Sequence, residues 1–339
     1  MVEYIIKRLI LGCFTLLAIL LVSYVLLRLA PGDPTRSSMF GSDSSAGTLD
    51  ASKGALQQNT ALREKLNLDK PILVGFGLWL REVVLHGDFG TSASVDPGKP
   101  VTEMILERLP VTLSLNFWAI VITYLCAIPL GVYAAVRAGG WFDRGSAFGL
   151  FLLYSLPVMW VALLLQTTLC EGGRWPIFPL KGLTPANEDS LSTWALQWEI
   201  LRHYMLPVLC LTYGNFAGLS RYARNGMLEV IHSDYIRTAR AKGVSETAVI
   251  WRHAFRNGLI TLITLFGGLL PSLVAGSLLV EYIFNIPGMG TLSLLALSSR
   301  DYPLQMALFA FTGMLTLGGI FISDMLYLAA DPRIKLHTK

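Results

Sequence analysis

Long apolar runs constrain this chain more than any other sequence feature, because each is long enough to cross a lipid bilayer. A membrane-spanning helix needs about 20 consecutive apolar residues to cross roughly 30 Å of hydrocarbon. When charges, prolines and glycines are used as boundaries, six stretches meet that requirement. We predict spans at Leu9–Leu29, Val111–Val136, Phe148–Cys170, Tyr204–Leu228, Leu259–Phe284 and Leu304–Ala329.

Composition supports a membrane class, since 53% of the 339 residues are hydrophobic and only 15% are charged. The first apolar stretch follows Lys7 and Arg8, but it is too long for a signal peptide and lacks a small-x-small cleavage site, so we read it as a retained anchor. The four cysteines have no Cys-x-x-Cys spacing, and the sequence therefore predicts neither a disulfide framework nor a metal site.

Lysines and arginines alternate between the connecting loops, and positively charged short loops tend to stay in the cytoplasm. Cations precede the first span, lie between the second and third and between the fourth and fifth, and follow the sixth. This pattern predicts that both termini are cytoplasmic. The net charge of +4 is then a topology signal, and no aromatic-interleaved basic patch indicates nucleic acid.

The segment after the first span is long enough to form an external subdomain. Its part at 37–54 is rich in Ser and Gly, which suits a flexible insertion, whereas Ala61–Leu85 has helical leucine spacing interrupted at Pro71. A linker without a partner and a docking role are both open readings. The predicted division is an anchor helix at 1–30, an external loop at 31–107, a five-helix core at 108–332 and a cytoplasmic tail at 333–339.

A charged amphipathic loop at 233–257 separates the fourth and fifth spans. Tyr235–Lys242 contains good helix formers, Gly243 suits a positive-φ stop, and Ser245 suits the N-cap of a second helix. On that second helix, Trp251 and Phe255 are expected in a buried apolar stripe, with Arg252 and Arg256 on another face. Such a helix could rest on anionic lipid or dock to a protein, and amphipathicity does not decide between them.

The run from Asp234 to Glu246 is similar to the cytoplasmic loop of binding-protein-dependent ABC importer permeases of the oligopeptide, dipeptide and nickel branch. Other segments resemble the same family in the same order, and together they cover nearly the whole chain. They are Leu27–Pro34, Gly87–Ser92, Leu109–Leu113, Val280–Gly290, Arg300–Pro303 and Asp331–Ile334. Arg174–Leu183 and Ala186–Ser190 further resemble a sub-branch that imports longer peptides and microcin C-like compounds.

The resemblance implies an all-α, type I ABC importer permease with six transmembrane helices in a bacterial inner membrane. Its expected partners are a second homologous permease, two ATP-binding subunits that carry ATP and Mg, an external substrate-binding protein, membrane lipid and a peptide substrate. The resemblance assigns ATPase docking to part of the loop. These docking residues are Tyr235, Arg237, Ala239, Arg240, Lys242, Gly243, Trp251, Arg252, Phe255 and Arg256. The general family pattern Glu-Ala-Ala-x-x-x-Gly is matched directly only at Ala239 and Gly243.

The chain itself has no phosphate-loop motif and no His-Glu-x-x-His pair, so we expect a transport subunit without catalytic residues, cofactor or metal of its own. Two acids are predicted near membrane depth. Asp324 is interpreted as a structural helix contact, together with Asp331 and Arg333, while Glu281 beside Asn285 could line the external mouth or cap a helix end. A proton-coupled secondary transporter and a nickel-chelate permease of the same family stay open as alternatives.

Overall fold

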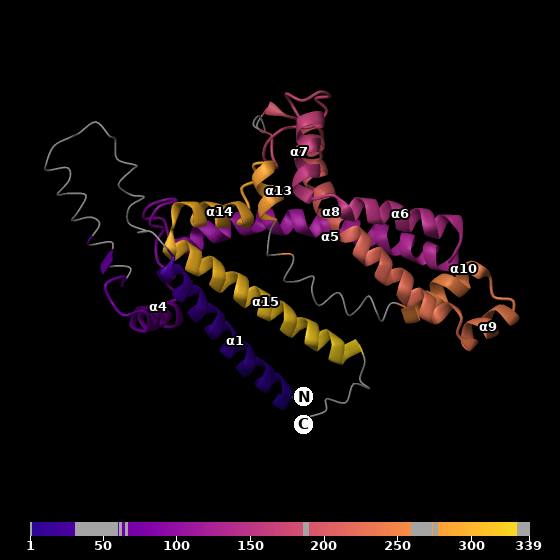
Figure 1. Ribbon diagram of the computed structural model, residues 1–339, viewed down its shortest axis with the longest axis horizontal. Coiled ribbons are helices and arrows are strands. Elements are labelled where there is room, and N and C mark those ends of the chain that lie inside the picture. Colours follow the sequence, from indigo (N-terminus) through magenta and orange to yellow (C-terminus); the bar gives the residue numbers. More distant parts are fainter. Residues whose placement is uncertain are drawn as a thin grey trace. The chain divides into compact units, whose positions relative to one another are not determined.

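The computed structural model describes residues 2–30, 60, 63–64, 67–185, 190–258, 273 and 277–330. Within these ranges the chain is helical, with isolated β-bridges and no strand, which confirms the predicted all-α class. Figure 1 shows the course of the helices. The chain divides into one unit of Met1–Pro110 with Gly288–Phe321 and a second of Val111–Pro287 with Ile322–Lys339. The predicted division at residues 30, 107 and 332 stays a prediction.

The first unit contains α1 (Val2–Leu29), α4 (Ile72–His86), the start of α5 (Val101–Val136), α14 (Met289–Ser299) and most of α15 (Tyr302–Ala330). Leu20 and Tyr24 of α1 are buried with Phe76 of α4 and Met306 of α15. α4 begins directly after Pro71, the residue that interrupts the helical leucine spacing predicted for Ala61–Leu85, and ends where Gly87 adopts a left-handed φ of 65°. α14 lies between the predicted fifth and sixth spans, in a segment where no span was predicted.

A single buried carboxylate organises the loop between α4 and α5. Asp301 Oδ2 accepts hydrogen bonds from the Ser92 hydroxyl at 2.5 Å and from the backbone N–H groups of Ala93, Ser94 and Val95 at 3.0, 2.9 and 3.1 Å. Its other oxygen accepts from the N–H of Leu304 at 3.2 Å, in the first turn of α15. The segments Gly87–Ser92 and Arg300–Pro303, far apart in sequence, are therefore two halves of one structural feature.

Arg28 fixes the turn that leads into α4. Its guanidinium donates to three backbone carbonyls, those of Asn67 and Leu68 at 3.0 Å and that of Lys70 at 2.7 Å. This arginine stands in the last turn of α1 and so joins that helix to the segment that leads into α4. Its role here is structural.

The second unit contains the remainder of α5 with α6 (Trp141–Ser155), α7 (Val158–Leu169), α8 (Thr193–Ile231) and α13 (Leu278–Ile283). α5 and α8 approach closely at Gly131, where a Cβ atom would collide with the carbonyl oxygen of Ser220 and lie 2.7 Å from Cβ of Ala223. Glycine is required there by the packing of one helix against the other.

The predicted span at Phe148–Cys170 was wrong as one continuous helix. α6 and α7 meet at Pro157 with a bend of 87°. Proline has no N–H to continue the helical ladder and restricts the residue before it to extended conformations, which accounts for the break. The carbonyl freed at Leu156 accepts a hydrogen bond from the hydroxyl of Tyr213 in α8 at 3.0 Å.

Of the described helices, three are long and apolar enough to cross a membrane, or four if α6 and α7 form one broken span. The three are residues Ile5–Leu29 of α1, Val101–Val136 and Tyr302–Ile322 of α15. α8 is longer than its predicted span, and most of the predicted fifth span lies outside the described residues, as does the insertion at 37–54. The number six stays a prediction.

Candidate functional site

The coupling loop, which we define as residues 233–257, consists of two short helical parts joined by a glycine turn. α9 (Asp234–Ala241) is followed by Lys242 and by Gly243 with φ of 77°, then by α10 (Glu246–Ala248) and the π-helical turn η2 (Val249–Ala254). Figure 1 shows α9 and α10 at the end of α8. The predicted order of helix, glycine turn and helix is confirmed, and Ser245 is the N-cap residue of α10, although its side chain makes no capping hydrogen bond.

One face of the coupling loop is buried against two long helices of its own unit, α5 and α8. Ile236 and Ala239 of α9 and Val249 and Ala254 of η2 pack on the ends of two long helices. The helix residues in this cluster are Val132 and Ala135 of α5 and Met227 of α8. Movement of the loop is therefore mechanically joined to α5 and α8.

The apolar stripe of the second helix differs from the predicted one. Trp251 was expected to be buried, but its side chain is 43% exposed and contacts the partly buried Phe255 edge to face, with ring centroids 5.1 Å apart. The fully buried residues are Val249 and Ala254, five positions apart. A π-helix repeats with i→i+5 hydrogen bonds, so its inward positions do not follow the 3.6-residue period on which the prediction rested.

Polar contacts close the coupling loop across its turn. Arg240 donates hydrogen bonds to the carboxylate of Glu246. Its Nε atom lies 3.2 Å from Oε1 and 3.1 Å from Oε2, and its Nη2 atom lies 2.7 Å from Oε1. This hydrogen bonding holds the pKa of Glu246 below its usual value. The Asn257 amide also donates to the Tyr235 hydroxyl at 2.8 Å, which ties the loop's end to its start. These contacts give the loop a defined shape.

The outer face of the coupling loop is cationic. Arg237, Lys242, Arg252 and Arg256 are exposed, and Arg237 makes only a long 3.5 Å contact with exposed Asp234. Ala239 differs from the other predicted docking residues because it lies on the buried face. The loop thus presents positive charge outward over an apolar underside.

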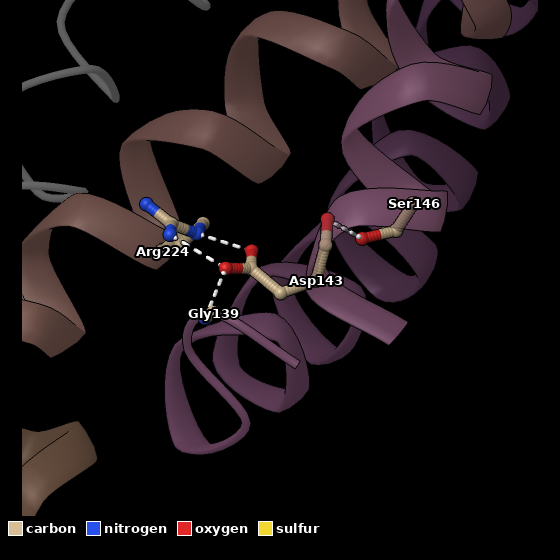
Figure 2. A network of polar contacts seen from close by, with 4 residues as sticks. All are labelled: Gly139, Asp143, Ser146 and Arg224. Carbon is tan, nitrogen blue, oxygen red and sulfur yellow. Dashed lines mark hydrogen bonds and ion pairs between the residues drawn. The ribbon is translucent and has the colours of Figure 1, made fainter. Parts of the chain in front are cut away.

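An ion pair that the sequence analysis did not predict joins α8 to the first turn of α6. Arg224 of α8 donates from Nε to Asp143 Oδ1 at 2.6 Å and from Nη2 to Oδ2 at 2.8 Å, and the Gly139 N–H donates to Oδ2 at 2.9 Å (Figure 2). Bidentate arginine–carboxylate pairs combine strength with fixed geometry. A lone Asp in the first turn after Gly139-Gly140, with an Arg inside an apolar stretch, was the available signal.

The predicted mouth residues lie in different environments. Glu281 of α13 is fully buried, where its carboxylate accepts a hydrogen bond from the Thr112 hydroxyl at 3.1 Å, whereas Asn285 is exposed with a positive φ of 50°. Asp324 lies in α15, and Asp331 and Arg333 fall outside the described residues. In this chain, Asn285 is thus the accessible member of the pair.

Two family descriptions match the chain. Residues 127–336 match the inner membrane component of binding-protein-dependent transport systems, and residues 1–116 match the N-terminal part of such membrane components. The chain therefore belongs to the family of binding-protein-dependent transport system inner membrane components, as its motifs predicted. It is an ABC permease and a membrane-spanning transport subunit, and this assignment does not favour a proton-coupled carrier.

Several relatives align over nearly their whole length. The oligopeptide transport system permease protein AppB of Bacillus subtilis (strain 168) is 38% identical over 99% of this chain and 100% of its own. The inner membrane ABC transporter permease protein YejB of Escherichia coli O157:H7 is 34% identical, with 98% of each chain covered. The peptidoglycan transport system permease protein YejB of Agrobacterium fabrum (strain C58 / ATCC 33970) is 32% identical, with 99% of each covered.

A solved structure confirms the fold class. The inward-facing MetNI methionine ABC transporter matches with a TM-score of 0.52 at 17% identity, covering 68% of this chain and 97% of that one. At this identity the likeness concerns the fold alone. It agrees with the predicted type I permease fold.

Proposed function

We propose that this chain is a permease subunit of an ATP-driven peptide importer in a bacterial inner membrane, with both termini in the cytoplasm. It forms half of a translocation pathway with a second homologous permease, under an external substrate-binding protein. Two partner subunits bind ATP and Mg and hydrolyse the ATP. Family membership supports the permease role, and the names of the aligned relatives support peptides as substrates.

The main support for this proposal is the coupling loop, because one of its faces packs on long helices while the other is exposed. Its apolar underside rests on α5 and α8, while its cations face outward and the Arg240–Glu246 pair fixes its turn. A rigid element of this kind transmits the motion of a docked subunit to the helices beneath it. We assign the docked subunit to an ATPase with an acidic cleft, which Arg252 and Arg256 would enter.

The outer end of the pathway is assigned to Asn285. Its side chain is accessible, and the buried Glu281 four residues earlier is hydrogen-bonded to Thr112 of α5, so the segment has a firm base. Peptide pathways must pass many side-chain shapes, and an amide offers both a donor and an acceptor without a fixed charge.

The experiment is purification of the tagged chain in mild detergent after co-expression with its partners, followed by peptide-stimulated ATP hydrolysis and peptide uptake. Two variants test the loop. In Gly243→Pro the ring cannot adopt a φ of 77° and removes the N–H that donates to the Arg240 carbonyl, and in Ala239→Asp a carboxylate enters the buried face. Both should abolish uptake while the chain still inserts into the membrane.

Matched controls are Gly243→Asn, which tolerates a left-handed φ, and Ala239→Ser, which keeps a small side chain. Both should retain most uptake. Full ATP-driven uptake by Gly243→Pro or Ala239→Asp would refute the docking assignment. Recovery of the folded wild-type chain without ATPase subunits would refute the importer proposal as a whole, and uptake that survives ATP depletion but collapses with an uncoupler would do the same.

A further inference from the structure

A groove of about 730 Å³ runs between α6 and α8 in the second unit. Its walls are apolar along much of their length, with Leu150 and Phe151 on α6 and Ala217 and Gly218 on α8. Arginine side chains from both helices line it as well. A groove with apolar walls and a cationic end suits an amphipathic ligand.

The charges in the groove do not cancel. Its lining includes Arg144, Arg221 and Arg224 and a single acid, Asp143. Asp143 is committed to Arg224 through two hydrogen bonds (Figure 2). Arg144 and Arg221 are exposed and have no ion pair within the described ranges, so the groove carries two uncompensated positive charges. This arrangement is complementary to an anion.

We call the part of the groove lined by Arg144, Arg221 and Arg224 its basic end. It lies toward the same end of α8 as the coupling loop. Ala134 lines the groove, while its neighbour Ala135 packs in the cluster that anchors the loop. On α8, Arg224 precedes Met227 of that cluster by less than one turn. If the loop faces cytoplasmic ATPases, a point that rests on the proposed function, the basic end lies at the cytoplasmic membrane surface.

We propose that this groove binds one anionic phospholipid, with its phosphate between Arg144 and Arg221 and an acyl chain along Leu150, Phe151 and Gly218. Basic pockets between transmembrane helices at the cytoplasmic side recognise acidic lipid head groups. Along α6 the groove's lining extends from Arg144 to Tyr154, about 15 Å at 1.5 Å per residue, which is longer than a head group needs, and its apolar walls match hydrocarbon. The aromatic ring of Tyr222, next to Arg221, also lines the groove, and tyrosine is a common residue at the membrane interface. A lipid bound here would contact both α6 and α8 near the coupling loop.

The test uses the purified complex of this chain with its partner permease and ATPases. After delipidation, the complex is incubated with phosphatidylglycerol or with phosphatidylcholine of the same acyl chains, and native mass spectrometry counts the retained lipid. We expect retention of phosphatidylglycerol only. Each arginine near the surface contributes roughly a fivefold gain in affinity, so Arg144→Gln with Arg221→Gln should weaken retention about 25-fold.

Two further variants separate charge from shape. Arg137→Gln removes a cation from the same end of α5 that does not line the groove, and it should leave retention unchanged. Gly218→Leu fills the apolar wall, and because a Cβ there meets nothing within 4 Å, the helix should tolerate the change while lipid is lost. All these variants should retain the ATPases, so loss of ATPases signals failure of the proposed function and not of the lipid site.

Three results would overturn the proposal. Equal retention of phosphatidylcholine would show that charge is not recognised, and displacement of phosphatidylglycerol by inorganic phosphate would show that the site takes a free anion. Retention by the isolated chain but not by the complex would show that another subunit covers the groove.

Discussion

Replacement of Asp301 by alanine should release the loop between α4 and α5. One oxygen of this fully buried carboxylate accepts four hydrogen bonds from Ser92 and from the N–H groups of residues 93–95, and the other accepts from Leu304. Alanine would remove this shared acceptor, and with it the hydrogen bonds that hold residues 92–95 against the start of α15.

The magnitude follows from these contacts. A hydrogen bond to a charged group contributes about 1.5–3 kcal/mol, and because four donors share one oxygen their energies are not additive. Counting two as independent gives a loss of about 3–6 kcal/mol. At about 2 °C or more per kcal/mol, the thermal midpoint of the first unit should fall by at least about 6 °C. The thermal midpoint of Asp301→Asn should lie between those of the wild type and Asp301→Ala. The asparagine amide keeps one acceptor oxygen, but its NH₂ group faces a hydrogen-bond donor of the protein.

Thermal unfolding in detergent, followed by tryptophan fluorescence, measures the midpoint, and limited proteolysis locates the opened segment at residues 91–99. Asp96→Ala is the matched control, since its side chain is exposed in the same loop. An unfolding midpoint of Asp301→Ala within about 1 °C of the wild type would contradict this prediction. Equal cleavage of Asp301→Ala and Asp96→Ala in this loop would do the same.

Two further predictions concern the second unit. Gly131→Ala should force α5 and α8 apart, because its Cβ would overlap the Ser220 carbonyl and Ala223, at a cost of about 1–3 kcal/mol. Gly145→Ala, where a Cβ meets nothing within 4 Å, is the control, and equal unfolding midpoints for the two variants would contradict the packing argument. The Arg240–Glu246 pair lowers the pKa of Glu246 from 4.5, so its contribution is complete above about pH 4.5 and is lost as the pH falls through the lowered value. Because both side chains are largely exposed, we expect Glu246→Gln to cost at most about 1 kcal/mol at pH 7 and nothing in strong acid, and a difference that persists at acid pH would show that charge is not its cause.

The sequence predicted the helical class, the family and the architecture of the coupling loop because each rests on local signals. Apolar length marks α1 and α15, and Gly243 marks the turn. It failed at two prolines, one used as a boundary and one placed inside a predicted span. Pro110 lies inside α5, which begins ten residues earlier than predicted, whereas Pro157 breaks a helix. The presence of a proline does not by itself say whether a helix continues through it or ends there, because this depends on how the neighbouring helices pack.

Contacts between distant residues were the other limit. Nothing local to Asp143 or Asp301 indicates that Arg224 or the 92–95 loop will meet it. The burial of Val249 and Ala254 in place of Trp251 depends on a π-helical turn, whose period no apolar pattern in a six-residue segment can reveal. These features appear only when the helices are assembled.

The bend between α6 and α7 has a consequence for how the chain enters the bilayer. α7 has 12 residues and is therefore about 18 Å long, too short to cross the hydrocarbon alone. At the bend, the Leu156 carbonyl finds its partner in Tyr213, on a helix that is synthesised later. An exposed carbonyl in lipid is costly. Tyr213 can satisfy this carbonyl only once α8 has been synthesised, so the bend between α6 and α7 is complete only when α8 packs against them.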